Sequence, residues 1–380
     1  MVRIAVFAVF LALVSWWVHR RLVRVVGLTG RPARVIDTAL VAFWVLALIG
    51  IGSGEVFDPV WARIPAFVGW TWLAALLYLV LGLVVLAAGS GIARLAGRPQ
   101  PTDPSRRRVL RGVTAAVAVA AVGTAGYGVV EAHTPRIQRV RVPLRRLPSE
   151  FAGTRIALVT DLHVGPSRGA GFTRKVVDLV NAQKPELVLL GGDLVDGTVA
   201  KVGADLEPLR DLRAPLGVFG VSGNHEFYAG DGGRWLDLWD TLGVRALRNE
   251  RVEIRRGGGV IDLAGIHDLT SPAPYEPDLP AALAGRDPER FVLLLAHEPK
   301  QALEASELGV DLQLSGHTHG GQLWPLGYLV PLQQPSVSGL DRIGDTVLYT
   351  TRGAGAWGPP ARVGAPPEIT ILELASRPRG

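Results

Sequence analysis

The sequence predicts an α/β domain that follows an all-α membrane region of about four helices. Residues 1–132 contain long apolar stretches and few acidic residues, whereas the later chain alternates short apolar runs with amphipathic segments. Five polar clusters follow five of these runs between residues 155 and 319. We therefore expect a membrane region over 1–132, a linker over 133–150 and the α/β domain over 151–380.

The membrane region contains four candidate spans. A helix needs about 20 predominantly apolar residues to cross the hydrocarbon core of a bilayer. Four apolar stretches approach or exceed this length, the first being short and the third long: residues 4–18, 35–52, 64–92 and 113–130. We expect all four to be helices that anchor the chain in a membrane.

Arginine placement predicts the orientation of these spans. Two connections are rich in arginine, and the connection between them has Glu55, Asp58 and only Arg63. The arginines are Arg20, Arg21, Arg24, Arg31 and Arg34 in the first connection, and Arg94, Arg98, Arg106, Arg107, Arg108 and Arg111 in the third. The positive-inside rule places both connections in the cytoplasm, so the α/β domain is expected outside it. This role also explains much of the net charge of +6, and we expect no nucleic-acid partner.

Residues 105–111, SRRRVLR, resemble a twin-arginine export signal and precede a weakly hydrophobic stretch. An ordinary basic anchor is an equally good interpretation. No small-x-small cleavage site precedes Glu131, so we expect the last span to be retained. The chain contains no cysteine, and the outer domain must therefore be stabilised by its hydrophobic core rather than by disulfides.

The α/β domain is predicted from five apolar runs that are typical of buried strands. These runs are residues 155–160, 186–190, 217–221, 291–295 and 311–314. Helical patterns lie between several of them, for example at 173–183 and 234–241. This alternation predicts parallel strands covered by helices.

A polar cluster follows each predicted strand, at the edge of the sheet where ligand sites gather. The clusters are Asp161-Leu162-His163, Gly192 to Asp196, Gly223 to Glu226, Ala296 to Glu298, and Gly316 to His319. They hold five of the eight histidines. Imidazole, carboxylate and carboxamide groups without a thiolate suit divalent metal ions of hard to borderline character.

The spacing within the clusters favours two metal ions. Asp161 and His163 are two residues apart, as are His317 and His319, so an extended backbone would direct each pair to the same side. Two cations about 3.5–4 Å apart require a shared ligand, and a carboxylate can bridge them. Asp193 is the best candidate for the bridge. Glycines within or beside the clusters allow sharp turns and close approach to a ligand.

Taken together, the five clusters resemble the motifs of the calcineurin-like metallophosphoesterase superfamily: D-x-H, GD-x-x-D, GNH(E), a lone H and GH-x-H. The segment 315–322, SGHTHGGQ, with 352–355, RGAG, and 367–369, PEI, resembles the membrane-associated bacterial branch. The resemblance covers about residues 150–380. It implies a four-layer sandwich in which two mixed sheets are flanked by helices.

The resemblance also implies a set of site residues. Asp161, His163 and His319 would hold one metal ion, and Asn224, His297 and His317 would hold the other, with Asp193 bridging. His225 would be catalytic rather than a ligand, facing the phosphate to stabilise the transition state or protonate the leaving oxygen. A metal-bridging hydroxide would attack phosphorus. Mn, Zn or Fe would suit the ligands, and their identity stays open.

Several neighbouring residues permit two interpretations. Asp196 is expected to hydrogen-bond within its own turn rather than act in the site. Glu226 and Glu298 either orient histidines or are solvated, and His267 is expected not to be a ligand. Arg168, Arg352 and Arg362 are either anion contacts or, more readily, surface charges. Tyr228, Trp235, Trp239 and Trp324 form either a lipid or sugar platform or ordinary packing, and packing is favoured.

These observations predict a membrane-anchored phosphoesterase that hydrolyses a phosphate monoester or diester. The anchor suggests a phospholipid, a lipid-linked sugar phosphate or a cell-envelope phosphodiester, although a resemblance at the metal site does not choose among them. One alternative is a non-catalytic membrane sensor or scaffold that retains a metal-binding domain. Another is a transporter with a regulatory outer domain, for which the spans offer few ionisable residues beyond Asp37 at an edge.

Overall fold

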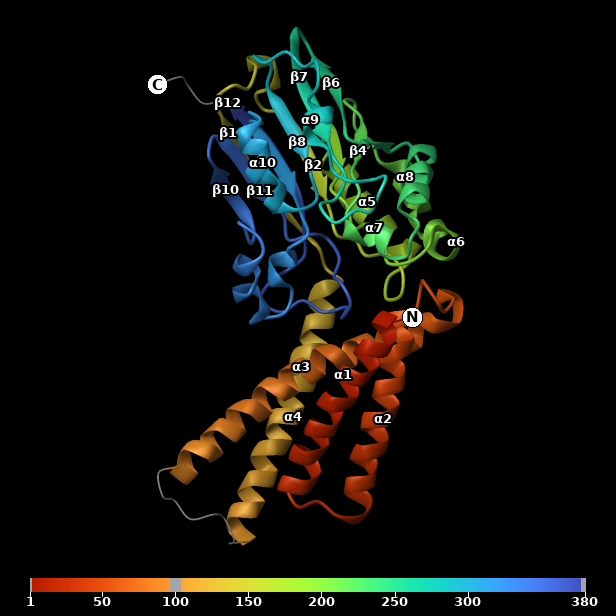
Figure 1. The fold of residues 1–380 in the computed structure, drawn as a ribbon, viewed down its shortest axis with the longest axis vertical. Helices are drawn as coiled ribbons and strands as arrows, with labels where there is room; N and C mark the ends of the chain where they lie inside the picture. Colours follow the sequence, from red (N-terminus) through yellow and green to blue (C-terminus); the bar gives the residue numbers. More distant parts are fainter. Residues whose placement is uncertain (1, 96–103, 377–380) are drawn as a thin grey trace. The chain divides into compact units, whose positions relative to one another are not determined.

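The computed structural model describes residues 2–95 and 104–376, and the chain forms two compact units (Figure 1). The first unit comprises Met1–Val130 and Gly358–Val363, and the second comprises Glu131–Trp357 and Gly364–Gly380. Arg98, one of the arginines used to predict the orientation, lies outside the described residues.

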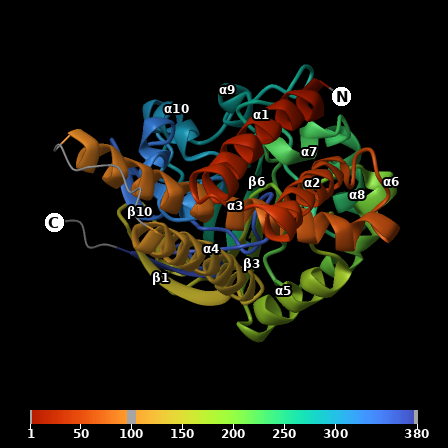
Figure 2. The ribbon, with the colours of Figure 1, turned by 90° about the horizontal axis from the view of Figure 1, so that it is seen from below.

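The first unit contains the four expected helices (Figures 1 and 2). They are α1 (Val2–His19), α2 (Gly30–Gly52), α3 (Pro59–Leu95) and α4 (Pro104–Ala132). A π-helical segment, Arg20–Val25, continues α1, so three of the arginines expected in a loop lie on this helical extension. Each helix contains a stretch long and apolar enough to cross a membrane: Ile4–Val25, Gly30–Gly52, Pro59–Gly89 and Arg107–Ala132.

Small and aliphatic side chains hold these helices together. One buried cluster joins Leu11 of α1, Leu40 of α2, Leu79 of α3 and Ala121 of α4. Gly69 of α3 lies against the backbone of α2, and a Cβ at this position would overlap the chain at Leu46. Small residues at such crossings let helices approach closely, as membrane helices require. Large apolar side chains face outward, including Val6, Phe10, Leu13, Val41 and Val85.

The second unit contains two six-stranded mixed sheets. In spatial order, the first sheet is β1 (Arg136–Leu144), β12 (Glu368–Ser376), β2 (Arg155–Val159), β3 (Leu187–Leu190), β4 (Val218–Gly220) and β5 (Arg245–Ala246). The second is β10 (Gly339–Ile343), β11 (Thr346–Thr350), β9 (Leu312–Ser315), β8 (Val292–Leu295), β7 (Gly259–Gly265) and β6 (Glu250–Arg256). Strands β2, β3 and β4 are parallel, as are β7, β8 and β9.

Helices flank both sheets. The α-helices are α5 (Ala170–Ala182), α6 (Val199–Val202), α7 (Asn224–Tyr228), α8 (Gly232–Thr241), α9 (Leu279–Ala282) and α10 (Ala302–Glu307). Short 3-10 segments are Ser149–Phe151, Gly203–Asp211, Pro299–Gln301, His319–Gly321, Leu326–Tyr328 and Val330–Leu332. The helical patterns expected at 173–183 and 234–241 correspond to α5 and α8.

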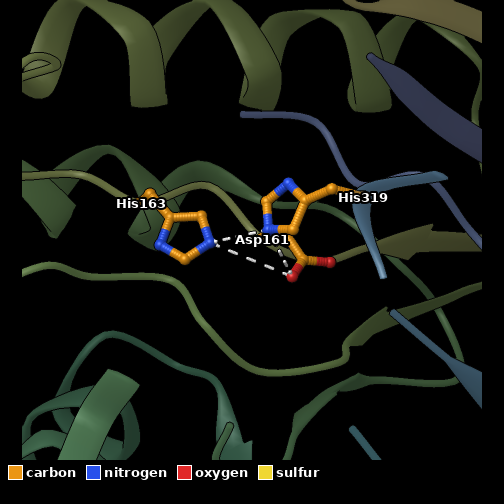
Figure 3. Close-up of side chains that lie close together, drawn as sticks. All are labelled: Asp161, His163 and His319. Atoms are coloured by element: carbon orange, nitrogen blue, oxygen red, sulfur yellow. Dashed lines mark hydrogen bonds and ion pairs between the residues drawn. The ribbon is translucent and has the colours of Figure 1, made fainter. Parts of the chain in front are cut away.

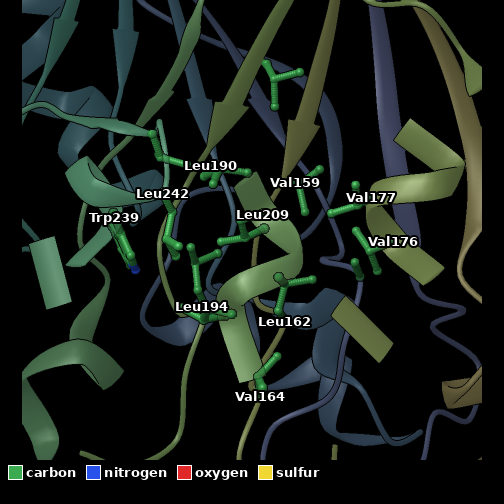
Figure 4. Close-up of a cluster of buried hydrophobic side chains, with 14 of the residues drawn as sticks. Val159, Leu162, Val164, Val176, Val177, Leu190, Leu194, Leu209, Trp239 and Leu242 are labelled. Atoms are coloured by element: carbon green, nitrogen blue, oxygen red, sulfur yellow. The ribbon is translucent and has the colours of Figure 1, made fainter. Parts of the chain in front are cut away.

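Alternating side chains along the strands create the layers, because successive residues of a strand point to opposite faces. Ile156 and Leu158 of β2 face the core between the sheets. Ala157 and Val159 face the opposite core, where α5 and α8 pack (Figure 4). The same alternation in β3 and β8 gives a helix–sheet–sheet–helix sandwich. The predicted four-layer fold is therefore confirmed.

The segment expected to be a linker, 133–150, contains a nine-residue strand, β1, paired with β12. Val142 and Leu144 alternate with exposed residues and are buried. Pro143 lacks a backbone N–H, but β1 is an edge strand and can accommodate it. The prolines in this segment suggested a linker, although the edge position allows a strand.

Candidate metal centre

Five parallel strands direct their carboxyl ends to one site in the second unit. Asp161 and His163 follow β2, Asp193 follows β3, and Asn224 follows β4 at the start of α7. From the other sheet, His297 follows β8, and His317 and His319 follow β9. Ligand atoms lie within 4.8 Å of one another in three groups: Asp161, His163 and His319; His163, Asp193 and His225; and Asp193, His297 and His317.

The first group has the donor arrangement of a cation site (Figure 3). Nε2 of His163 lies 3.0 Å from Nε2 of His319, which lies 3.2 Å from Oδ1 of Asp161. Nδ1 of His163 donates to Oδ1 of Asp196 at 2.9 Å, so Nε2 is the ring atom that would offer a lone pair to a cation. Such convergence of lone pairs is favourable around a cation.

A second group of donors lies on the other side of Asp193. Nδ1 of His317 lies 3.1 Å from Oδ1 of Asn224 and 3.2 Å from Nε2 of His297. Nδ1 of His297 donates to the carbonyl oxygen of Gly191 at 2.7 Å, so Nε2 is the ring atom that would face a cation. The amide nitrogen of Asn224 donates to Tyr228 Oη at 2.7 Å, so its oxygen turns toward His317.

Asp193 connects the two groups through one oxygen atom. Its Oδ2 lies 3.8 Å from Nε2 of His163 and 3.2 Å from Nε2 of His297. Its Oδ1 accepts the backbone N–H of His225 at 2.8 Å, which fixes the carboxylate orientation. A Cβ at Gly223 would overlap Oδ1, so glycine is required there for this approach. Oδ2 is therefore placed where two cations could share it.

The backbone explanation for the paired residues was wrong. Asp161 and His163 have φ angles of 55° and 47°, and His317 and His319 have 68° and 54°, rather than extended values. Asp193 also has a positive φ angle, 52°. Left-handed backbone is uncommon outside glycine, although Asp and His tolerate it better than most residues. Its concentration at these positions is typical of a functional site, where surrounding contacts maintain strain.

Comparison with known proteins identifies the family. Residues 154–321 match the family described as calcineurin-like phosphoesterase. A transmembrane protein with metallophosphoesterase domain from Bos taurus is 34% identical, over 92% of this chain and 84% of its own length. This chain belongs to the calcineurin-like phosphoesterase family. The corresponding protein of Danio rerio is 33% identical, over 83% of this chain and 74% of its own.

A bacterial member is similar across a comparable range. The uncharacterized metallophosphoesterase YkuE of Bacillus subtilis is 31% identical, over 72% of this chain and 98% of its own length. These matches confirm the resemblance seen in the sequence motifs. The family typically binds divalent metals, and the two donor groups of this chain have the chemistry for that role.

The carboxylates of the centre remain charged despite complete burial. Burial alone would raise the pKa of Asp193, but His297, His225 and His163 outweigh it and hold this pKa well below the ordinary value. At Asp161, burial would likewise raise the pKa, but His319 outweighs burial and lowers it. Two buried carboxylates can therefore offset part of the charge of two divalent cations.

Asp196 joins a ligand histidine to His225. Its Oδ1 accepts from Nδ1 of His163 at 2.9 Å and from Nδ1 of His225 at 2.6 Å. The expectation that it bonds within its own turn was wrong, because both partners come from other loops. Burial would lower the pKa of His225, but Asp193 and Asp196 outweigh burial and raise it to about 9. The His225 ring is thus oriented and kept protonated.

Glu226 holds two of the polar loops together. It is fully buried, and its Oε2 accepts from the backbone N–H groups of Asp193 at 3.0 Å and Gly223 at 2.7 Å. Its Oε1 accepts from the N–H of Leu194 at 2.7 Å. Burial, with the nearby charge of Asp193, raises the pKa of Glu226 to about 7. Glu226 is therefore not solvated and binds backbone rather than a histidine.

Glu298 and His267 lie beside the donor groups. Glu298 is buried, accepts from Nε2 of Gln334 at 2.7 Å, and has Oε2 4.0 Å from Nε2 of His317. It too is not solvated. His267 belongs to none of the three groups found among the described residues, and its Nδ1 lies 3.1 Å from Oγ of Ser222. Burial lowers the pKa of His267 to about 4, so it is neutral.

The surface-charge interpretation was wrong for the three arginines. Arg168 is only 2% exposed, stacks 5.3 Å from the Phe172 ring centroid and donates to the carbonyl of Ala356 at 3.0 Å. Burial lowers the pKa of Arg168 to about 10 against the opposing charge of Asp196. Arg362 is fully buried in the first unit, and the half-buried Arg352 pairs with Glu368 through Nε at 2.7 Å.

The four aromatic residues divide into two kinds. Trp235 and Trp239 are fully buried in the core between helices and sheet, where the packing interpretation holds. Tyr228 and Trp324 are exposed. Tyr228 has its ring centroid 4.5 Å from that of His225, so it lies at the edge of the centre.

Substitution of single histidines should separate ligands from other site residues. His297→Ala should reduce the metal bound to the full chain by about half, because Nε2 of His297 faces the second donor group. His225→Ala should retain the full metal content, because Nδ1 of His225 is hydrogen-bonded to Asp196 and His225 is not one of the proposed ligands. Inductively coupled plasma mass spectrometry after loading and gel filtration measures both. Equal metal loss in the two variants would contradict this division.

Proposed function

We propose that this protein is a membrane-anchored, dinuclear metal-dependent phosphoesterase. The observation that carries this proposal is the position of Asp193 Oδ2, which is shared between two groups of nitrogen and oxygen donors. Asp161, His163 and His319 would hold one cation, and Asn224, His297 and His317 the other. Mn, Zn or Fe are the metals we expect from donors without a thiolate.

The metal ions and the protein side chains would have different roles in the reaction. Bound divalent cations would supply the nucleophile and the charge neutralisation that phosphate-ester hydrolysis needs. Protonated His225 would stabilise the phosphoryl oxygens or donate its Nε2 proton to the leaving oxygen. Asp196 accepts a hydrogen bond from Nδ1 of His225 and so orients the His225 ring. Proton transfer from a positioned group typically contributes about 10²–10⁴-fold in rate.

The substrate we propose is a phosphate monoester or diester carried by a lipid or a cell-envelope component. The four apolar helices support this class, because they would keep the catalytic unit beside a membrane. A non-catalytic sensor or scaffold is the alternative. The His225–Asp196 pair favours the enzyme, because metal binding alone gives no reason to hold a protonated imidazole beside the donors.

We propose that the chain is a multi-pass membrane protein with its catalytic unit outside the cytoplasm. Matches to relatives named transmembrane proteins extend over 83% and 92% of this chain, so they include much of the helical region. The arginine-rich connections support the orientation.

Residues 105–111, with the possible export signal, lie in the first turns of α4. His19 pairs with Asp37 at 2.6 Å where α1 ends, and this neutralising contact gives little support to a transporter.

Hydrolysis by the full chain in detergent micelles tests the enzyme class. After chelation and addition of Mn²⁺, we expect cleavage of p-nitrophenyl phosphate or bis-p-nitrophenyl phosphate, and a loss of about 100-fold or more in His225→Ala. The ratio of diester to monoester rates narrows the substrate. A folded protein that binds two ions yet cleaves neither ester with Mn²⁺, Zn²⁺ or Fe²⁺ would favour the sensor alternative.

The pH dependence of the rate tests the role of Asp196. His225 must be protonated to act as an acid, so the rate should fall as pH rises through its raised pKa. Asp196→Asn removes a neighbouring negative charge, which lowers this pKa and should move the alkaline limb down by about one unit or more. The pH–rate profile measures the shift, with metal content as the control because Asp196 also contacts His163. An unmoved alkaline limb at full metal loading would contradict the role.

Protease accessibility tests the orientation. Protease added to intact spheroplasts of an expressing bacterium should digest the chain after His133, while a cytoplasmic marker protein stays intact. Immunodetection of a tag at the C-terminus measures the digestion. Complete protection of the catalytic unit, with digestion after detergent lysis, would place it in the cytoplasm.

A further inference from the structure

An uncharged segment follows the last donor residue of the centre. Residues 320–340 contain no Asp, Glu, Lys, Arg or His, although charged residues make up 19% of the chain. Within this segment, residues 323–332, LWPLGYLVPL, are almost entirely apolar. We call these ten residues the apolar loop. The loop belongs to the second unit and includes the 3-10 segments Leu326–Tyr328 and Val330–Leu332.

The apolar loop exposes most of its large side chains. Tyr328 and Leu332 are 77% and 80% exposed, and Trp324, Leu326 and Leu329 are also exposed. A single exposed apolar residue is ordinary on a soluble surface. Five in nine consecutive positions form a patch that indicates contact with a partner or a membrane.

Hydrogen bonds hold the apolar loop in this conformation. Successive backbone bonds join Leu326 to Leu323 at 2.8 Å, Leu329 to Leu326 at 2.9 Å and Leu332 to Leu329 at 3.1 Å. Beyond the loop, the buried side chain of Gln334 donates to Glu298 at 2.7 Å. The apolar side chains are therefore presented by a defined backbone.

The apolar loop is connected to the edge of the metal centre. Before it, Gln322 donates from Nε2 to the carbonyl of Trp357 at 2.7 Å and accepts the N–H of Trp357 at 2.9 Å. The exposed Trp357 ring has its centroid 6.0 Å from that of His225. Trp357 therefore connects the base of the loop to the edge of the centre.

The base of the apolar loop also lies near the start of the catalytic unit. Leu323 pairs with Gly364, and three residues later the carbonyl of Pro367 accepts the N–H of Arg136 at 3.0 Å. Three extended residues span roughly 11 Å at most. Arg136 begins β1, four positions after Ala132 ends the apolar helix α4. The first strand of the catalytic unit thus begins close to the base of the loop.

We propose that the apolar loop inserts into the lipid–water interface of the bilayer that anchors the chain. Trp and Tyr with aliphatic neighbours suit this interface, where the rings are apolar and their polar atoms meet water. The uncharged sequence removes the cost of desolvating ionised groups. The loop would hold the metal centre at the membrane surface, where it would receive phosphate esters with lipid tails. This inference rests on the proposed membrane anchoring.

Single-cysteine reporters test the insertion directly, because the chain contains no cysteine. The full chain carrying Tyr328→Cys or Leu332→Cys would be labelled with a nitrobenzoxadiazole fluorophore in phosphatidylcholine–phosphatidylglycerol nanodiscs. Leu303→Cys on α10 is the matched control, because it is 50% exposed and lies outside the loop. We expect blue-shifted emission and quenching by doxyl-labelled lipid at 328 and 332 only.

Three fluorescence results would overturn the proposal. If labels at 328 and 332 emit as in water and are not quenched by the lipid, like the label at 303, the apolar loop stays outside the lipid. Blue-shifted emission without lipid quenching would show that protein, from this chain or another, covers the loop. Quenching at all three positions would show non-specific adsorption rather than insertion by the loop.

A pair of esters tests the effect on catalysis. Methyl p-nitrophenyl phosphate and hexadecyl p-nitrophenyl phosphate share a leaving group and differ in the lipid tail. Leu329→Glu with Leu332→Glu should lower the rate on the hexadecyl ester in vesicles by about tenfold or more, with the methyl ester unchanged. An equal loss of rate on both esters would contradict the proposal, and so would an unchanged rate on both. If wild type cleaves neither of these diesters while the fluorescence shows insertion, the proposed diester hydrolysis fails and the loop assignment stands.

Discussion

The carboxylate of Asp193 is the group on which the arrangement of the site depends. Oδ2 faces both donor groups, Oδ1 accepts the N–H of His225, and the backbone N–H of Asp193 is held by Glu226. A rotation of this side chain would separate the two donor groups and at the same time move His225. The site is therefore one connected hydrogen-bonded unit, in which changes at Asp193, Glu226 and His225 should not be additive.

The four-layer fold supplies the rigidity that this arrangement requires. Each sheet contributes parallel strands whose carboxyl ends meet at one edge, and apolar cores on both sheet faces fix the strands. The donor residues then leave the strands through left-handed backbone at Asp161, Asp193 and His317. Such conformations persist where packing and hydrogen bonds determine them, and here the sheets anchor the segments before each turn.

Sequence reasoning predicted the strands and the candidate residues because both have local signals. Apolar runs followed by Asp, Asn or His can be read from neighbouring positions, as at Asp161 and His297. The partners of Asp196 and Glu226 could not be predicted in this way, because their contacts join loops about 30 residues or more apart in the chain. Strand β1 was missed because Pro143 suggests a linker unless its edge position is known.

The division into two units places the whole candidate site within the second unit. All seven proposed metal ligands and His225 belong to the second unit, and the helices of the first contribute none of them. A change in those helices would therefore leave the donor geometry intact. Because such a centre can act on many phosphate esters, selectivity must come from the surfaces around it. Tyr228, Trp357 and the apolar loop are exposed apolar groups beside it, and under the proposed function they would favour an ester whose remaining part is apolar as well.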